Sequence, residues 1–439
     1  MLAITLAITL SGCGTADTVR EKALPVVAPI TAPFPNSDML SEFYDASDSS
    51  DTVYETGVSE ITDITTNPTA IANTDKSINY DTQKAMWFSY IDISKMLTKK
   101  TEEQFTDSFR TALANCEDMG INTLYVHVRP FGDALYKSDY FPYSKIITGV
   151  YGQTPPYDPL EIMVREAHAK QLSLHAWVNP FRLNTVAEME SYSGIVGYPV
   201  NDWYNSGLQD DVATAPMLEY DGRWYLNPSD TRARKLIADG AYELVERYNV
   251  DGVNIDDYFY PTGDLGWDNA YYVSHSNGVN TSAEQFRYNA CTEVMSAINN
   301  AVHAANSTAL FGICPAGNID NNYLYEYADV RVWASALDDY GRGVYCDYVA
   351  PQLYFGYENE TQPFETVLLK WRVFTRVPLY VGLACYKEDK TDKYAGTGAT
   401  EWLVSGNAEQ SVIARQIETA LADTDGYALY SYYYAVKEG

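Results

Sequence analysis

Apolar residues recur along this chain in eight short runs that are rich in β-branched and aromatic side chains. In the second run, Val126 and Val128 alternate with the polar residues His127 and Arg129. A period of two is typical of a β-strand, because successive side chains point to opposite faces. The runs predicted to form strands are Met86–Asp92, Asn122–Pro130, Leu172–Pro180, the segment from Asp251, Ala309–Gly317, Asp347–Phe355, Pro378–Tyr386 and Gly426–Tyr434.

Amphipathic stretches of helical length separate most of these runs. They are Thr101–Met119, Pro159–Lys170, Asp230–Tyr248, Ala283–Ala305 and Asn407–Ala422. Regular alternation of strand and helix over most of the chain favours a parallel sheet that closes on itself. The predicted fold class is therefore α/β, a (β/α)8 barrel of the TIM type.

The alternation also predicts which side chains share a face. In such barrels the apolar phase packs on the outer helices, and the polar phase fills the lumen and its carboxyl-terminal mouth. Barrel enzymes keep their chemistry at that mouth. The polar residues predicted to meet there are Arg129, Asn179, Asp256 and Tyr354.

The segment Asp251–Pro261 ends in carboxylates and tyrosines and carries the strongest catalytic candidate. Its residues Asp256 and Tyr258 share the inner face. Burying a carboxylate there is costly without a partner or a function. Glycoside hydrolysis supplies a function, because its oxocarbenium-like transition state needs a carboxylate beneath the reacting sugar. The alternative role of Asp256 is a buried ion pair with Arg129 or His175.

Two more aspartates are catalytic candidates. Asp257 either acts as an acid or base or holds the loop Tyr258–Pro261. Asp133 reaches the mouth from the loop after the second strand and is a candidate proton donor. Asp251 lies at the start of its strand, at the wrong end for chemistry, where turn residues are common.

Arg, Asn, Gln, His and Tyr side chains supply candidate substrate contacts. Arg129 and Arg182 suit bidentate contact with an anionic saccharide, although Arg129 could instead close the mouth by bonding backbone carbonyls. The chain contains 38 Tyr beside 14 Phe, and a Tyr ring can stack on a sugar while its hydroxyl bonds the sugar hydroxyls. His175 has the alternative of filling the barrel core. The candidate substrate-binding residues are Arg129, His175, Asn179, Arg182, Tyr258, Tyr260, Gln352 and Tyr354.

The start of the chain predicts export and a lipid anchor. The apolar run Leu2–Leu10 leads into Ser11-Gly12-Cys13, the pattern of a bacterial lipoprotein signal with Cys13 as the lipidated residue. An ordinary signal peptide that contains a cysteine is the alternative. We expect a membrane-anchored protein on the extracytoplasmic side.

Residues 14–82 are rich in Ser, Thr, Asp, Asn and Pro, and acidic residues outnumber basic ones. This composition predicts a disordered, self-repelling spacer, and a small independent fold is the alternative. The barrel domain is expected over residues 83–439.

Net charge and cysteine spacing exclude several classes of partner. The formal net charge of −29 and the pI near 4.4 argue against nucleic acid, since phosphate contacts need a basic face. Besides Cys13 there are five cysteines, without CxxC spacing, and they are predicted to be buried thiols. The five histidines lack HExxH spacing. We therefore expect no metal and no cofactor.

Several ordered motifs resemble one known family. Together they are similar to the glycosyl-hydrolase-like family 10 barrels over nearly all of Lys84–Tyr434. The resemblance implies an exported lipoprotein that cleaves peptidoglycan glycan strands already stripped of their stem peptides. The motifs are VRPFGDALYKS (Val128–Ser138), Tyr157–Arg182, YLNPSD (Tyr225–Asp230), VDGVNIDDYFYP (Val250–Pro261), FGICPAGN (Phe311–Asn318) and APQLYF (Ala350–Phe355).

A more distant resemblance links the strand from Asp251 to the family 18 chitinases, whose fourth strand ends in DGxDxDxE. In that frame Asp256 keeps the position that orients the substrate N-acetyl group, and Asn254 replaces a carboxylate. Tyr258 stands where the chitinase acid would be, so the acid role is not carried over. Gln352-Leu353-Tyr354 is similar to the sixth-strand motif of those enzymes.

The sequence therefore predicts a lipid-anchored glycoside hydrolase whose substrate is cell-wall glycan. A hydrolase of another polysaccharide is the alternative within the same class. A non-catalytic carbohydrate-binding lipoprotein is the alternative from a different class, and Tyr258 at the chitinase acid position motivates it.

Overall fold

The computed structural model describes residues 76–256, 259–276, 281–403 and 411–436. All of them belong to one compact unit, Ala72–Gly439. Cys13, Asp257 and Tyr258, which the sequence singled out, lie outside the described residues.

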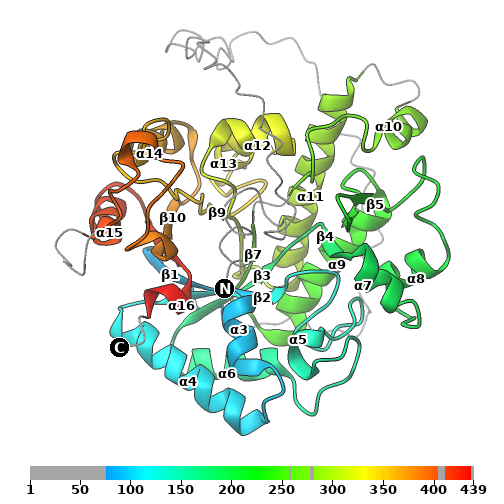
Figure 1. Cartoon of the computed structure of the whole chain (residues 1–439), viewed down its shortest axis with the longest axis horizontal. Helices are drawn as coiled ribbons and strands as arrows, with labels where there is room; N and C mark the ends of the chain where they lie inside the picture. Colours follow the sequence, from blue (N-terminus) through cyan, green and yellow to red (C-terminus); the bar gives the residue numbers. More distant parts are fainter. Residues whose placement is uncertain (1–75, 257–258, 277–280, 404–410, 437–439) are drawn as a thin grey trace. The chain divides into compact units, whose positions relative to one another are not determined.

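Eight parallel strands form a sheet that curls into a barrel (Figure 1). The strand order is β10-β11-β1-β2-β3-β7-β8-β9. Two hydrogen bonds join the ends of this order, from Val349 N–H to Pro378 O at 3.0 Å and from Gly382 N–H to Pro351 O at 2.9 Å. The predicted (β/α)8 barrel is confirmed. Its strands are β1 (Gln83–Phe88), β2 (Thr123–Arg129), β3 (Ser173–Val178), β7 (Gly252–Ile255), β8 (Leu310–Ile313), β9 (Tyr348–Val349), β10 (Tyr380–Ala384) and β11 (Gly426–Tyr430).

The amphipathic stretches form helices close to their predicted bounds. Side-chain caps set several of the starts: Asp158 accepts from Leu160 N–H at 3.0 Å, and Asp230 accepts from Arg232 N–H at 2.8 Å. Pro159 at the first helical position adds to the first of these. The five helices are α4 (Glu102–Asp118), α6 (Pro159–Ala169), α9 (Thr231–Tyr248), α11 (Ala283–Ala305) and α15 (Val412–Asp423), and a further outer helix is α14 (Phe364–Phe374).

The first and last strands are shorter than predicted. Ser89 caps helix α3 (Tyr90–Leu97) through a capping box with Asp92, so β1 ends at Phe88. At the other end of the chain, Tyr432–Ala435 form the short helix α16, and β11 ends at Tyr430. The Asp92 carboxylate accepts from Tyr433 N–H at 3.0 Å. The first and last elements of the barrel are thereby tied to each other beside the mouth.

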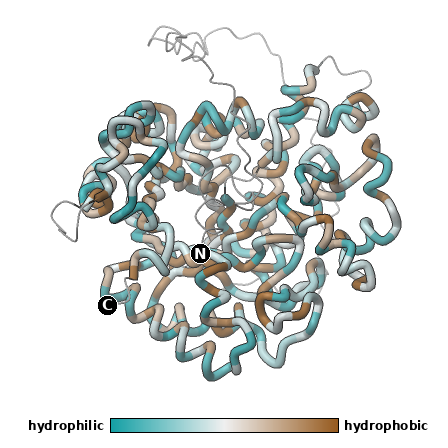
Figure 2. The backbone as a smooth tube through the Cα atoms, in the orientation of Figure 1, coloured by the Kyte–Doolittle hydropathy of each residue, from teal (hydrophilic) through white to brown (hydrophobic). Residues whose placement is uncertain are grey.

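The predicted alternation divides the strand residues into two apolar layers. Val126, Leu174 and Val253 pack outward into the large core beneath the helices. Trp87, Tyr125, Trp177, Tyr348 and Tyr380 belong to a separate cluster that fills the lumen. Hydrophobic residues accordingly concentrate in the strands and on the inner faces of the helices (Figure 2). Burying one large apolar side chain contributes roughly 1.5–3 kcal/mol, so the two layers dominate stability.

A segment ahead of β1 closes the amino-terminal end of the barrel. Ile78 N–H donates to the Asp251 carboxylate at 2.7 Å, and the Asn79 amide donates to Thr308 O at 3.0 Å. The same carboxylate accepts from Leu174 N–H at 2.8 Å. Asp251 therefore lies at the end opposite the mouth, as predicted. Contacts with the barrel begin before Gln83, in residues that the sequence had assigned to the spacer.

A small antiparallel sheet is inserted between β3 and α9, and the sequence patterns did not predict it. Its order is β4-β6-β5. The β5–β6 turn places Asp221 and Gly222 at positive φ values of 49° and 77°, the conformation that two-residue hairpins require. The insertion comprises β4 (Arg182–Thr185), α7 (Val186–Ser191), α8 (Pro199–Asn205), β5 (Met217–Tyr220) and β6 (Arg223–Leu226).

A buried ion pair holds the long loop that follows β7. Arg287 of α11 pairs with Asp268 and also donates to Asp264 O at 3.0 Å. The guanidinium lies 5.1 Å from the Tyr260 ring centroid and 4.7 Å from that of Tyr327. Removing one partner of such a pair typically costs about 3–5 kcal/mol. The loop that leaves the strand end is therefore fixed from its far side.

Two further properties hold for the described residues. Among these residues, Cys116, Cys291, Cys314, Cys346 and Cys385 form no disulfide and are buried thiols, as predicted. Among the described helices, none is both long and apolar enough to cross a membrane.

The loop after β2 buries Asp133, which is 1% exposed. Its charged neighbours are Glu188 of α7 and Lys145 of the short helix α5 (Lys145–Thr148). Burial raises the pKa of Asp133 from 3.8 to about 7; a hydrogen bond with Ser144 and the charge of Lys145 oppose this shift, and Glu188 adds to it. The folded protein therefore retains a proton on Asp133 at a pH where the unfolded chain has lost it.

We expect Asp133→Asn to stabilise the protein more at alkaline than at acidic pH. Because the folded pKa lies above the unfolded value, Asp133 costs stability progressively as the pH rises from about 4 to about 7, and the cost is constant above that. The shift corresponds to at most about 4 kcal/mol. Urea denaturation of both proteins at about pH 4.5 and about pH 8 measures the difference.

Asp107→Asn is the control for this comparison, because the Asp107 side chain is 68% exposed. It should change the free energy of unfolding by a similar small amount at both pH values. A pH-independent effect of Asp133→Asn would contradict the raised pKa.

Candidate active site

The Asp256 carboxylate lies directly after β7, at the carboxyl-terminal mouth of the barrel, and is 3% exposed. Trp177 Nε1–H donates to its Oδ2 at 3.0 Å. The Asn179 amide donates to Oδ1 and Oδ2 at 3.2 and 3.3 Å. Both donors come from the end of β3, which pairs with β7. The predicted meeting of Asp256 and Asn179 is therefore confirmed.

The backbone fixes the orientation of Asn179. Its side-chain oxygen accepts from Arg182 N–H at 3.0 Å, so the amide N–H group faces Asp256. Asn179 N–H itself donates to Arg129 O at 2.9 Å, which continues the pairing of β2 with β3. Hydrogen bonds from neutral donors favour the ionised form of a carboxylate without cancelling its charge. The arrangement suits a group that must stay negative beside a substrate.

A ring stack supports the donor on the other side of Asp256. His127 of β2 stacks on Trp177, with ring centroids 3.7 Å apart and an interplanar angle of 13°. His127 also meets the Tyr90 ring edge-on at 5.7 Å. Burial, with a smaller effect of the Arg182 charge, lowers the pKa of His127 well below its usual value. His127 and Trp177 were not among the predicted site residues, although both occupy the polar phase of their strands.

Aromatic side chains continue the mouth on the side of β9, β10 and β11. The predicted residue Tyr354 lies 5.8 Å from Tyr430 and 5.9 Å from Tyr386, measured between ring centroids. Tyr430 in turn contacts Trp177 edge-on at 6.4 Å. The predicted residue Gln352 donates to Cys314 O at 3.0 Å and lies at the same strand ends. Tyr386 and Tyr430 are mouth residues that sequence reasoning missed.

The predicted position of Arg129 at the mouth is wrong. A β-bulge shifts the register of β2 from His127↔Trp177 to Arg129↔Val178, so Arg129 takes the outward phase of Val178. The guanidinium lies 4.2 Å from the Phe141 ring centroid, beneath helix α9. Arg129 therefore belongs to the layer between barrel and helices.

His175 faces the lumen but lies toward its amino-terminal end. It pairs with Gly252, the first residue of β7, whereas Asp256 follows the last. Its ring nitrogens bond Tyr348 Oη at 2.7 Å and Asn79 Oδ1 at 3.2 Å. Burial lowers the pKa of His175 to about 4. This placement corresponds to the alternative of a core residue.

Tyr260 lies in the core and not at a surface. It is 3% exposed, and its hydroxyl is 2.9 Å from Ser229 Oγ. The rings of Trp267 and Tyr327 pack edge-on against it at 5.7 and 5.3 Å. Neighbouring rings therefore cover the Tyr260 ring, and its predicted contact with a sugar stays a prediction.

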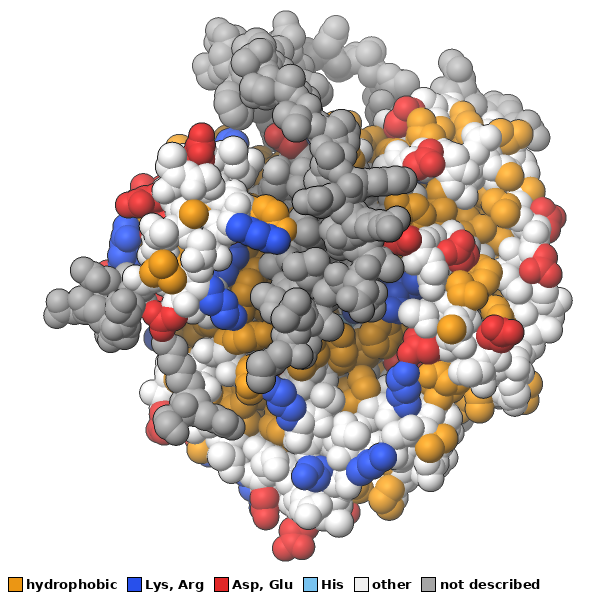
Figure 3. Space-filling model, in the orientation of Figure 1, with side chains coloured by type: hydrophobic (Ala, Val, Ile, Leu, Met, Phe, Trp, Pro, Cys, Tyr) orange, Lys and Arg blue, Asp and Glu red, His pale blue; other side chains and the backbone are white. Residues whose placement is uncertain are grey.

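Two arginines lie near the mouth from the side of the insertion. Arg182 Nη2 donates to Pro130 O at 3.3 Å, and its guanidinium lies 5.0 Å from the Phe131 ring centroid. Arg223 of β6, which sequence reasoning missed, lies 5.1 Å from the same ring. On the face viewed in Figure 3, Lys and Arg side chains lie beside the central region, and Asp and Glu side chains lie both beside it and toward the rim.

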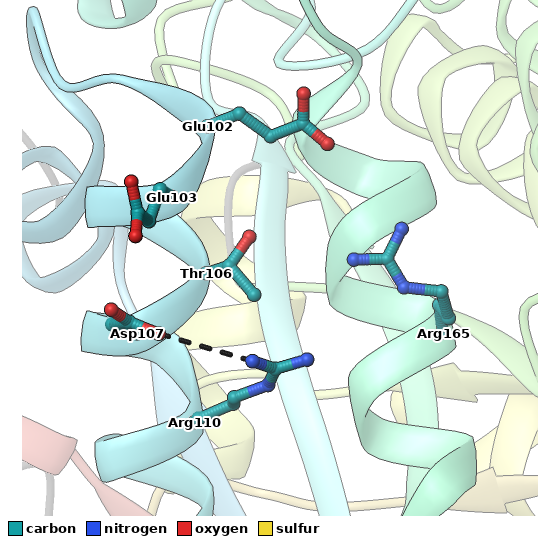
Figure 4. Close-up of a pocket in the computed structure, with 6 residues that line it drawn as sticks. All are labelled: Glu102, Glu103, Thr106, Asp107, Arg110 and Arg165. Atoms are coloured by element: carbon teal, nitrogen blue, oxygen red, sulfur yellow. Dashed lines mark ion pairs between the residues drawn. The ribbon is translucent and has the colours of Figure 1, made fainter.

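Asp133 and a surface groove are separate from this arrangement. Asp133 lies with residues of α5 and α7, as described above. A groove of about 350 Å³ lies between α4 and α6 on the outside of the barrel (Figure 4). Arg110 in this groove pairs with Glu166 at 2.7 Å and with Asp107 at 3.8 Å. The groove is lined by three acidic residues, two basic residues and one threonine, namely Glu102, Glu103, Asp107, Arg110, Arg165 and Thr106.

Within the described parts of the chain, no group of three or more His, Cys, Asp or Glu is arranged to hold a metal ion. The chemistry available from the described residues at the mouth is that of a fixed carboxylate, an imidazole, amides, arginines and aromatic rings.

Comparisons with known proteins agree with this chemistry. Glycosyl hydrolase YngK of Bacillus subtilis (strain 168) is 30% identical over 333 residues, which cover 69% of this chain and 61% of that protein. Glycosyl hydrolase DigH of Escherichia coli (strain K12) is 29% identical over 345 residues, which cover 72% of this chain and 73% of that protein. The chain thus spans less than two thirds of the length of YngK.

A solved structure supports the fold. The glycoside hydrolase domain of PgaB (BpsB) from Bordetella bronchiseptica superposes with a TM-score of 0.51 at 9% identity, over 80% of this chain and 94% of that domain. The glycosyl hydrolase-like 10 family matches residues 83–396. These findings support a glycosidase, and the chain belongs to the glycosyl hydrolase-like 10 family.

Proposed function

We propose that this protein hydrolyses glycosidic bonds in peptidoglycan glycan strands whose stem peptides have been removed, with Asp256 as the catalytic carboxylate. The observation that carries the proposal is the buried Asp256 carboxylate at the barrel mouth, fixed by Trp177 and Asn179. The relatives named glycosyl hydrolases add support. The substrate is inferred from the sequence motifs of the family.

Asp256 would act on the positive charge that develops at the anomeric carbon. Because Trp177 and Asn179 already orient the carboxylate, little reorganisation is needed when that charge appears. Both of these donors are neutral, so they orient the carboxylate without cancelling its charge. The burial of the site strengthens the attraction, since few water dipoles screen it.

A second carboxyl group must protonate the leaving oxygen. Asp133 belongs to the layer of α5 and α7, while Asp257 follows Asp256 directly in the chain. The sequence offers Asp257 and Asp133 as the candidates for this proton donor.

Charge supports an acidic sugar as part of the substrate. The lactyl group of N-acetylmuramic acid is a carboxylate, whereas chitooligosaccharides carry no charge. A protein with a net charge of −29 repels anions at long range. Arg182 and Arg223, which converge on Phe131 near the mouth, offer a local site where an acidic sugar can bind.

Two alternatives predict different outcomes in one assay. Purified protein is incubated with peptide-free glycan strands, chitooligosaccharides and an α-glucan. Soluble fragments from the first substrate alone support the proposal. Cleavage of another glycan would indicate a different polysaccharide hydrolase, and binding without any cleavage would indicate a carbohydrate-binding lipoprotein.

We expect Asp256→Asn to lower kcat by about 10²-fold or more while leaving the fold and much of the glycan affinity intact. Asparagine keeps the shape and removes the charge that the transition state needs, so the loss enters kcat and not KM. Fragment release from peptide-free strands measures kcat, and calorimetry measures binding.

Asp133→Asn is the matched control, because it neutralises another buried aspartate, whose neighbours are Ser144, Lys145 and Glu188. It should retain wild-type kcat within a few-fold. An Asp256→Asn enzyme with more than about a tenth of wild-type kcat would contradict the role of Asp256.

We expect Arg223→Gln to weaken binding of N-acetylmuramyl strands about tenfold to hundredfold more than binding of chitooligosaccharides. A hydrogen bond to a charged group contributes roughly 1.5–3 kcal/mol, and only the acidic sugar forms it. Added salt should also strengthen wild-type binding of the acidic strands by screening the protein's long-range repulsion.

Arg129→Gln is the control for this selectivity. Arg129 is buried between the barrel and α9, so its replacement should lower stability without changing the preference between the two glycans. Equal losses on both glycans for Arg223→Gln would show that the arginine serves the scaffold.

We also propose that the protein is exported and anchored by a lipid on Cys13. The run Leu2–Leu10 followed by Ser11-Gly12-Cys13 motivates this proposal. We expect Cys13→Ser to abolish incorporation of a radiolabelled fatty acid and to move the protein out of the membrane fraction. A wild-type protein that takes up no fatty acid would leave only the ordinary signal peptide.

A further inference from the structure

Two histidines face the barrel lumen, and their hydrogen bonding differs completely. His175, near the amino-terminal end, bonds Tyr348 through one ring nitrogen and Asn79 through the other. His127, near the mouth, is 1% exposed, and within the described residues neither of its ring nitrogens has a hydrogen-bond partner. A buried imidazole therefore has both polar atoms unsatisfied at the end where Asp256 lies.

Leaving these atoms unsatisfied is costly. A buried donor or acceptor without a partner lowers stability, and nearly all such groups in native proteins are paired. A hydrophobic ring such as Phe would stack on Trp177 without that cost. The presence of His127 therefore points to a polar partner that arrives with a ligand.

The surroundings of His127 indicate where this ligand lies. Its ring stacks on Trp177, and the indole N–H of Trp177 donates to Asp256. The Trp177 ring therefore contacts both the imidazole and the carboxylate. Tyr90 contacts its edge, and the charge of Arg182 acts on it. A neutral imidazole offers one donor and one acceptor. Sugar hydroxyls and acetamido groups offer the same combination.

We propose that His127 is a substrate-binding residue that hydrogen-bonds a hydroxyl or acetamido group of the sugar bound at Asp256. The inference rests on the proposed function in that the ligand is a glycan. It does not require hydrolysis, so binding can test it separately.

Three substitutions separate the polar role of His127 from its packing role. His127→Phe keeps a flat ring on Trp177 and removes both nitrogens. His127→Asn places an amide near the position of Nδ1, and His127→Gln places one near Nε2. Each is made in the wild-type protein for kinetics and together with Asp256→Asn for binding. Thermal unfolding of every variant reports any loss of packing.

The ligands are oligosaccharides of N-acetylglucosamine, peptide-free glycan strands and a maltooligosaccharide, each titrated calorimetrically. We expect His127→Phe to weaken the glycan bound by wild type about tenfold, with a Tm equal to or above that of wild type. Either the Asn or the Gln variant should recover most of the affinity, and the one that does identifies the nitrogen that contacts the sugar.

Wild-type affinity in His127→Phe would overturn the proposal, since the nitrogens would then be dispensable. A loss of affinity that accompanies a large fall in Tm, and that neither amide variant reverses, would overturn it as well, because it marks a packing role. Weaker binding by His127→Phe in a protein that cleaves no glycan would refute the hydrolase and support His127. Unchanged binding by His127→Phe in an enzyme that cleaves glycan would support the hydrolase and overturn the proposed role of His127.

Discussion

The alternation of side chains along parallel strands is the constraint on which this structure depends. Once the sheet closes, one phase of each strand must pack against helices and the other must fit a lumen of fixed width. The lumen is filled tightly: a Cβ on Gly312 would lie 1.9 Å from the Tyr348 ring, so the glycine is what admits that tyrosine. The same phase that fills the lumen delivers Trp177 and Asn254 inward and leaves Asp256 at the end of the series. Packing and chemistry are thus two consequences of one geometric rule.

At the mouth, the protein surrounds a carboxylate with neutral hydrogen-bond donors. The indole and amide donors orient the carboxylate without themselves neutralising its charge. The basic groups, Arg182 and Arg223, instead gather around Phe131 at the side of the mouth. The two guanidinium groups contact the Phe131 ring, whereas the Asp256 carboxylate accepts hydrogen bonds from Trp177 and Asn179.

Much of this architecture could be predicted from the sequence. The eight strands and five of the helices follow from hydrophobic periodicity, and the pairing of Asp256 with Asn179 follows from phase and strand position. Periodicity failed where the backbone departs from regular geometry. At Arg129, one extra residue in β2 reverses the phase, and only the pairing partner reveals this. For His175, periodicity correctly predicted that the side chain faces the lumen. Its position along the barrel axis depends on the stagger between neighbouring strands, which the sequence of one strand does not determine. Tyr260 lies in a loop, where alternation predicts nothing.

The lumen cluster has one more consequence, which concerns the path of a polymer. Trp87, Tyr125, Tyr348 and Tyr380 fill the interior from wall to wall, and Asn79 caps the far end. The barrel interior is therefore filled and closed at its amino-terminal end, and a glycan strand cannot pass through it. A long substrate would have to lie across the rim of the barrel, with both of its ends extending into solution. The filled lumen therefore confines any substrate to the rim of the barrel, where Asp256 lies.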